Sequence, residues 1–147
     1  MATATGSRRL PGSRPAPGVV RFHLDHLRDP IGHFDLTDVD RTLRESVACA
    51  DEGYSAVTLA KYPDLRVVLI SMRAGARIEE SKAEARLSLQ AVRGRAVLRL
   101  PEGPIELSAQ QLITLERGML HDLEAVTDCA LLLTLAWPAN GEVRPRA

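Results

Sequence analysis

Aromatic residues are scarce in this chain, and neither sign of charge is in excess. Phe, Trp and Tyr make up 3% of the 147 residues, and 19 basic side chains are balanced by 19 acidic ones. Proteins that bind nucleic acid usually carry a basic excess, and those that hold single strands add aromatic side chains for stacking. The composition therefore argues against a nucleic-acid partner.

Cysteine is also rare, and long apolar runs are missing. The two cysteines, Cys49 and Cys129, lie far apart and outside any CxxC pattern, so we expect two apolar packing thiols in a reducing compartment. No stretch approaches 18 uninterrupted apolar residues, and no apolar signal-peptide core follows Arg8 and Arg9. These absences predict a cytoplasmic protein without a membrane span.

Both ends of the chain have the composition of tails. Residues 1–18 are Ala, Gly, Ser, Pro and Arg with little to bury, and residues 139–147 return to that composition. Such segments cannot offset the entropy of ordering, so we expect them to be disordered. Residues 19–138 then form one domain, which is long enough to bury a core.

Three histidines, His23, His26 and His33, open the domain and raise the hypothesis of a metal site. No cysteine or acidic residue completes a known ligand spacing around them, and Pro30 and Gly32 break any shared helix face. The pattern therefore gives little support to metal binding in this segment.

A short helix is predicted over residues 37–51. Thr37 is the expected N-cap, and the acidic residues after it suit the helix dipole. Val39, Leu43 and Val47 recur at four-residue steps and form one apolar face. We expect this face to pack on the outside of a barrel or on a partner subunit.

From residue 55 onward the hydrophobic period changes to that of short strands. Turn-forming residues separate seven β-rich runs, which are residues 55–62, 63–72, 86–92, 95–100, 111–115, 120–126 and 129–137. Short strands at regular spacing indicate an antiparallel sandwich or barrel. The runs 66–72 and 129–137 are almost wholly apolar, as in strands covered on both faces. The predicted fold class is all-β with one short N-terminal helix.

Two glycine-marked segments carry a resemblance to a known family. Gly75 and Gly94 frame the first segment, and Gly118 begins a Gly-x-x-His turn that ends at His121. In this spacing, and in phrases such as YPDLRVVLISMRAGARI, residues 34–138 resemble a small single-domain bacterial cupin. Gln110 and Glu116 stand where the second cupin motif has glycine and proline. The resemblance implies an antiparallel, jelly-roll-like cupin β-barrel.

The resemblance also implies a degenerate metal site. Cupins hold a metal with three histidines and a glutamate, and the matching positions here are Ser81, Ala83, Leu87 and His121. One imidazole binds a divalent metal weakly, so no cofactor is expected, with His121 as the single candidate ligand. Glu79 has the strand parity of position 81 and is the residue available to rebuild a site.

The ligand positions of the resemblance define a pocket at the mouth of the barrel. Its expected lining is Ser81, Ala83, Leu87, Met119 and His121. We expect His121 to form a hydrogen bond with Ser81, Gln111 or water, and imidazole also leaves a role in proton transfer or ligand recognition open. Lys82 at the rim is expected to be a solvated charge.

Three functions fit these residues. The first is a non-catalytic module, without catalytic residues, that binds a small organic molecule or dimerises, since small barrels cover exposed edges by pairing. Gln90 faces either that ligand or a dimer interface, and Trp137 anchors a core or an interface. The second is a metal-dependent oxygenase or isomerase with ligands rebuilt around His121. The third is a regulatory partner that uses the arginines of the N-terminal tail.

Overall fold

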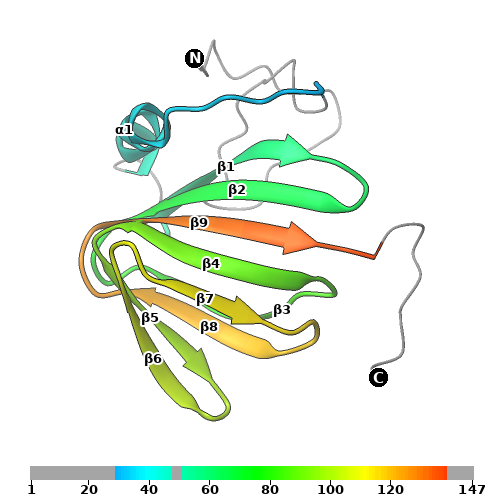
Figure 1. Ribbon diagram of the computed structural model, residues 1–147. Helices are drawn as coiled ribbons and strands as arrows, with labels where there is room; N and C mark the ends of the chain where they lie inside the picture. The colour runs from blue at the N-terminus through cyan, green and yellow to red at the C-terminus, as the bar shows by residue number, and fades with distance from the viewer. Residues whose placement is uncertain (1–28, 48–50, 139–147) are drawn as a thin grey trace.

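The structure, a computed structural model, describes residues 29–47 and 51–138 (Figure 1). This part of the chain has one helix and nine strands. They are α1 Leu36–Val47, β1 Tyr54–Lys61, β2 Leu65–Met72, β3 Arg77–Lys82, β4 Arg86–Arg93, β5 Arg95–Leu100, β6 Gly103–Ser108, β7 Leu112–Leu115, β8 Leu120–Ala125 and β9 Cys129–Ala136. No helix in these two ranges has the length and apolar character to cross a membrane. The predicted tails, His23, His26 and Cys49 lie outside the described residues.

The strands form two antiparallel sheets that face each other. Sheet A has the order β1-β2-β9-β4-β7, and sheet B has the order β3-β8-β5-β6. Alternate side chains of each strand point between the sheets, and one core unites Leu89 and Leu131 of sheet A with Leu98 and Leu123 of sheet B. The fold class predicted from the sequence, a jelly-roll-like barrel with one short helix, is confirmed (Figure 1).

The interior of the barrel is closed at one end and open at the other. At the closed end Ala91, Ala96, Ala125 and Cys129 are at most 2% exposed. Toward the other end, where β9 finishes and β8 begins, the inward-facing Leu100, Leu133 and Leu135 are only half-buried. This open end lies at the right of the view in Figure 1. These leucine side chains are therefore partly accessible to solvent at this end.

One strand, β6, was missed by the sequence analysis, and β3, which the cupin resemblance treated as a strand, was not among the seven β-rich runs. β3 reads RIEESK, and β6 begins with Gly-Pro, so neither has the apolar alternation that marks a strand. Both are edge strands of sheet B, where pairing on one side is sufficient and the outer face is solvated. Their pairing with β8 and β5 overrides the weak local preference.

The helix covers the outer face of sheet A, as predicted. Val39 and Leu43 are buried against Leu59 and Leu69 of β1 and β2, whereas the side chain of Val47 lies outside the described set. A buried ion pair also fastens the helix to the barrel. Arg93 Nε of β4 donates to the Asp40 carboxylate at 2.8 Å.

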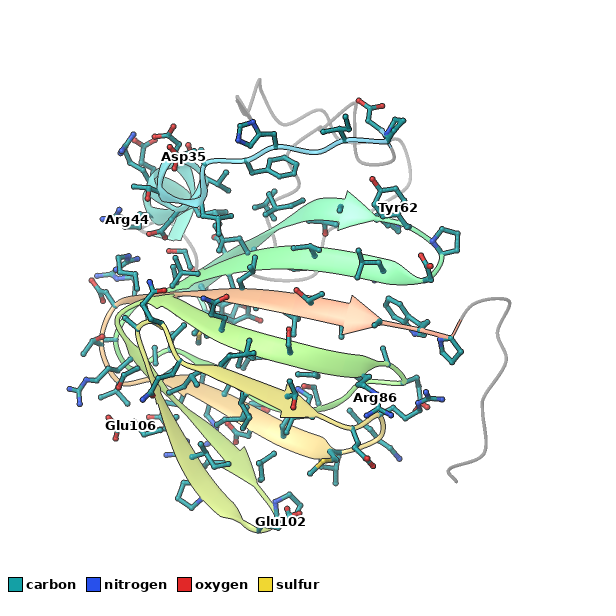
Figure 2. All side chains as sticks on the ribbon, viewed as in Figure 1. Asp35, Arg44, Tyr62, Arg86, Glu102 and Glu106 are labelled. Atoms are coloured by element: carbon teal, nitrogen blue, oxygen red, sulfur yellow. The ribbon has the colours of Figure 1, made fainter. Side chains whose placement is uncertain are left out.

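The helix boundaries differ from the prediction. Asp35, not Thr37, is the N-cap, because its Oδ1 accepts from the backbone N–H of Thr37 at 3.0 Å and of Asp38 at 3.4 Å (Figure 2). The ionised carboxylate also interacts favourably with the helix dipole, which a threonine hydroxyl does less well. At the other end the helix finishes at Val47, and Asp51 lies in a turn.

Candidate functional site

The residues at the two cupin motifs meet at the open end of the barrel. Ser81 of β3 and His121 of β8 are direct partners in the β3–β8 ladder. His121 has the same strand parity as the core residues Leu123 and Ala125, so its ring is on the inner face. The Ser81 hydroxyl and His121 Nε2 lie 3.1 Å apart. The expected hydrogen bond between these two side chains is therefore present.

The partner of the second ring nitrogen determines which side chain donates in this hydrogen bond. His121 Nδ1 lies 3.1 Å from the Met119 carbonyl oxygen, which can only accept. In the neutral ring Nδ1 must then carry the proton, and Nε2 accepts from the Ser81 hydroxyl. Both nitrogens of His121 are thus occupied by protein groups. Gln111, the alternative partner considered from the sequence, instead accepts from the backbone N–H of Ser108 at 2.8 Å.

The other predicted pocket residues form an apolar wall beside this pair. Leu87 of β4 is 5% exposed and is paired with Leu115 and Leu135. Ala83 and Met119 are half-buried and pack on the same core. The five predicted residues therefore lie around one end of the barrel, with Ser81 and His121 as its polar members.

Glu79 does not join this site. The prediction from strand parity, that Glu79 faces inward beside Ser81, is therefore wrong. Ile78 pairs with Leu123 and Ser81 with His121, so β3 has one residue more than β8 between these pairs. This β-bulge turns both Ile78 and Ser81 inward, although their numbers differ in parity. Glu79 is exposed. It adds to the effect of Asp122 in raising the pKa of Arg77 on the outer face.

The donor set does not fit the metal of a cupin. Of the four ligand positions, Ser81, Ala83 and Leu87 have no side chain that competes for Zn, Fe or Mn, and His121 alone supplies an imidazole. Across residues 29–47 and 51–138, no three His, Cys, Asp or Glu side chains gather as a metal site would require. His33 is exposed on the segment before α1.

A cation at the open end was missed by the sequence analysis. Arg66 lies on β2 with the inward parity of Val68 and Ile70, and its guanidinium carbon is 5.4 Å from the centre of the Trp137 ring. Its Nε is buried and has no hydrogen-bond partner. The sequence gives no signal for this stacking, because Trp137 lies far along the chain from the apolar strand that contains Arg66. Trp137 was assigned only a packing role.

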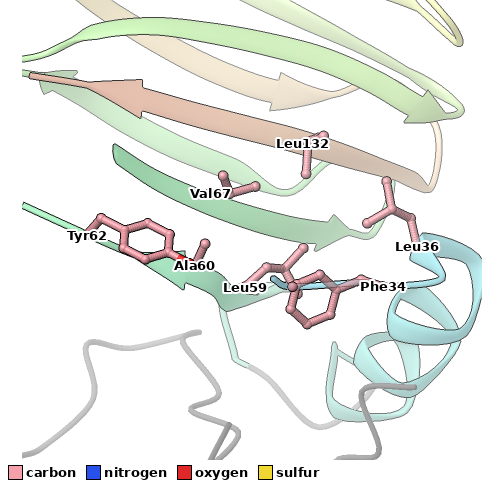
Figure 3. Close-up of a pocket in the computed structure, with 8 residues that line it drawn as sticks. Phe34, Leu36, Leu59, Ala60, Tyr62, Val67 and Leu132 are labelled. Carbon is pink, nitrogen blue, oxygen red and sulfur yellow. The ribbon is translucent and has the colours of Figure 1, made fainter. Parts of the chain in front are cut away.

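A separate apolar groove lies on the outside of sheet A (Figure 3). It has a volume of about 370 Å³, and Phe34 and Leu36 face Leu59, Tyr62 and Leu132 across it. None of the five predicted pocket residues lines this groove. It belongs to the packing of the segment before α1 against the outer face of the sheet, and it is distinct from the open end of the barrel.

The glycines that carried the cupin resemblance occupy turns that require them. Gly75, Gly94 and Gly118 all have positive φ, at 86°, 73° and 81°. Gln110, which replaces a motif glycine, has φ 74° and is the non-glycine residue with positive φ in the described part of the chain. The backbone at this position thus keeps a glycine conformation although the side chain has changed.

Comparisons with known proteins agree with the fold. The sequence matches no protein-family model and no curated protein. Among crystal structures, a cupin superfamily protein from Desulfitobacterium hafniense is 15% identical, with a TM-score of 0.55 over 90% of this chain and 98% of that one. An RmlC-like cupin from Desulfovibrio desulfuricans is 18% identical, with a TM-score of 0.54 over 58% and 84%. A cupin-2 domain protein from Shewanella frigidimarina is 12% identical, with a TM-score of 0.54 over 70% and 93%.

These structures establish the fold. The chain has the cupin fold, in the form of a small single barrel with one helix on its outer face. Sequence identities of this size show a shared fold but not a shared activity. The function therefore has to be argued from the residues at the open end of this barrel.

Proposed function

We propose that this protein is a non-catalytic cupin that binds a small organic molecule at the open end of its barrel without a metal. The supporting observation is the Ser81–His121 pair, which stands in the ligand positions with both imidazole nitrogens hydrogen-bonded to protein groups. Around it the inner wall is apolar, with Leu87 and Met119 as neighbours. A mostly apolar site with a few fixed polar groups is typical of small-molecule recognition.

Two measurements on the full chain test this proposal. Elemental analysis of freshly purified, untagged protein is expected to give far less than one metal per chain. A calorimetric titration with neutral hexanamide is expected to show binding that Leu87→Glu abolishes, because a buried carboxylate disfavours an apolar ligand. The competing hypothesis, a metal-dependent oxygenase or isomerase, predicts near-stoichiometric metal that His121→Ala removes. His33→Ala is the matched control, since His33 is exposed outside the barrel.

We further propose that two copies pair through the outer face of sheet A. The outer face of sheet B is covered by cross-strand ion pairs, such as Arg99 with Glu124 and Arg95 with Glu106, and is suited to water. The outer face of sheet A beside α1 instead carries mostly uncharged side chains, among them Gln90 and Thr134, with Arg86 as an exposed charge at one end. The part of this face around Gln90 and Thr134 meets its own copy without like-charge repulsion, as a two-fold interface requires.

Light scattering on a sizing column tests the pairing. The wild-type chain is expected to elute as a dimer at micromolar concentration, and Thr134→Lys is expected to convert it to a monomer. Val97→Lys, on the outer face of sheet B, is the control and should leave the mass unchanged. A wild-type monomer, or equal effects of the two lysines, would contradict this part of the proposal.

A reducing, cytoplasmic location is part of the same proposal. Cys129 is buried and free, and burial raises the pKa of its thiol to about 11. Such a thiol is an inert packing group and not half of a disulfide. Fractionation of the native host should find the protein with the cytoplasmic fraction; recovery from an oxidising compartment would contradict this location.

A further inference from the structure

Arg66 is a half-buried cation that has no acidic partner among the described residues. Its guanidinium stacks on Trp137, and the backbone N–H of Trp137 is anchored to the Asp64 carbonyl at 2.9 Å. The buried Nε of Arg66 makes no hydrogen bond. Leaving a charged donor buried and unpaired costs more than leaving a neutral one, so this group requires an explanation.

The neighbour of Arg66 increases this cost. Lys61 is directly opposite Arg66 in the β1–β2 ladder, after the irregularity between Thr58 and Ala60. Like charges placed directly opposite each other destabilise a sheet. No acidic side chain of the described residues pairs with either cation, whereas four other arginines of the barrel strands, Arg77, Arg93, Arg95 and Arg99, all do. Lys82 and Arg86 also lie on strands without an acidic partner, but both are exposed, whereas Arg66 is half-buried.

The surroundings of Arg66 define what kind of anion fits. Its direct partner on β9 is Leu135, which in turn pairs with the buried Leu87 on β4. A guanidinium offers a planar fork that matches a carboxylate with two parallel hydrogen bonds. The leucines beside it suit an aliphatic chain and disfavour a strongly hydrated dianion.

We propose that Arg66, stacked on Trp137, binds the carboxylate of a small amphipathic acid whose aliphatic part lies against Leu135 and Leu87. This inference rests on the proposed function, because it names the ligand class of the same open end. Lys61 adds a second positive charge at the rim. The pair of like charges is then the unliganded state of an anion site, in which the acid removes the repulsion between Arg66 and Lys61.

Calorimetric titration of the full-length protein with sodium hexanoate and with neutral hexanamide tests the inference. Hexanoate is expected to bind at least about tenfold more tightly than hexanamide, since a hydrogen bond to a charged group adds roughly that factor. Arg66→Met keeps the aliphatic contact with Trp137. It is expected to lower the affinity for hexanoate about ten- to hundredfold and to leave the affinity for hexanamide unchanged. Arg66→Lys keeps the charge but not the planar guanidinium, so its affinity for hexanoate should lie between those of the wild type and Arg66→Met.

Arg86→Gln is the matched control for general electrostatics. Arg86 lies at the same end of sheet A but is exposed on the outer face, where Figure 2 labels it. Its substitution is expected to change hexanoate affinity by less than about twofold, because exposed charges are screened by salt. An equal effect of Arg86→Gln and Arg66→Met would overturn the assignment to Arg66.

The melting temperature without ligand separates a binding role from a structural one. Arg66→Met removes an unpaired charge, so its melting temperature is expected to equal or exceed that of the wild type. A lower melting temperature with unchanged hexanoate affinity would overturn the inference, as would inorganic phosphate binding more tightly than hexanoate. Hexanamide binding without any preference for hexanoate would overturn this inference alone, whereas failure of both ligands would also overturn the proposed function.

Discussion

Ser81 and His121 are direct partners across the β3–β8 ladder, and the hydroxyl of Ser81 donates to His121 Nε2 at 3.1 Å. The Met119 carbonyl accepts from the opposite nitrogen of the ring. In a metal-binding cupin the corresponding imidazole would turn a free nitrogen toward the metal. Here that nitrogen instead accepts a hydrogen bond from a serine hydroxyl. The pair is therefore a fixed polar group in an apolar wall.

This arrangement predicts the tautomer of His121. A long-range ¹H–¹⁵N correlation spectrum of the neutral ring is expected to show a protonated Nδ1 and an unprotonated Nε2, because a carbonyl accepts from the first. Ser81→Ala should shift the Nε2 resonance of His121, and Ser88→Ala, on β4 and distant in the sheet order, should not. A ring protonated at Nε2 would contradict the hydrogen-bond scheme.

The motif glycines are expected to differ in their tolerance of substitution. A Cβ on Gly94 would lie 2.1 Å from the Asp128 carbonyl oxygen, whereas a Cβ on Gly75 meets nothing within 4 Å. Both residues have positive φ, which costs about 1–2 kcal/mol for alanine. Gly75→Ala should show only that loss in urea unfolding. Gly94→Ala should lose more than about 3 kcal/mol in the free energy of unfolding or fail to fold, because the backbone around Asp128 must move. Equal losses in the two variants would contradict the clash.

Gln110→Gly is expected to stabilise the protein. Gln110 has φ 74°, a conformation that glycine adopts without strain. The relief of strain is partly offset by the greater freedom of glycine in the unfolded chain, so we expect a net gain of about 0.5–1 kcal/mol in urea unfolding. Gln111→Gly is the control and should destabilise, since it removes the acceptor for Ser108 N–H. A loss of stability in Gln110→Gly would indicate a side-chain contact that outweighs the strain.

The attachment of the helix is expected to depend on Asp40. Its side chain is 5% exposed and is paired with Arg93 of β4, so Asp40→Ala leaves a cation without its partner. We expect a loss of about 3 kcal/mol in the free energy of unfolding, as for other buried pairs that lose one member. Arg41→Ala breaks only the exposed pair with Asp38 and should cost less than about 0.5 kcal/mol. Similar losses for the two variants would mean that the buried pair contributes little.

Asp122 is expected to contribute to the acid sensitivity of the fold. Its hydrogen bonds with Arg77, including one from Nε at 2.9 Å, lower the pKa of the carboxyl in the folded state. Folding is therefore favoured by this group above its unfolded pKa of about 4, and the contribution is lost as pH falls through the lower folded pKa. Thermal unfolding between pH 6 and pH 2 should show a shallower decline for Asp122→Asn than for the wild type.

The control for this prediction is Glu106→Gln, which removes a carboxylate from the half-exposed pair with Arg95. Because solvent screens this pair, its removal should leave the pH dependence close to that of the wild type. An unchanged pH dependence in Asp122→Asn would show that the Arg77 interaction is not maintained in solution.

Much of the candidate site followed from spacing along the chain. Ser81 and His121 were expected to meet because both stand at ligand positions of the cupin resemblance, and the ladder pairs them directly. The same logic failed for Glu79, because a bulge between Ile78 and Ser81 changes which residues face inward. A bulge leaves no mark in a strand as polar as RIEESK, so strand parity was not a safe guide there.

The sequence by itself determined the features that depend on near neighbours: the apolar face of α1, the runs of the longer strands, and the glycines at turns. These follow from backbone sterics and hydrophobic period, which act within a few residues. Only the tertiary structure decided that Arg66 stacks on Trp137, that Asp40 meets Arg93, and that Leu133 and Leu135 of β9 are less buried than Leu131. Such contacts join distant segments, and their energy depends on which groups burial brings together.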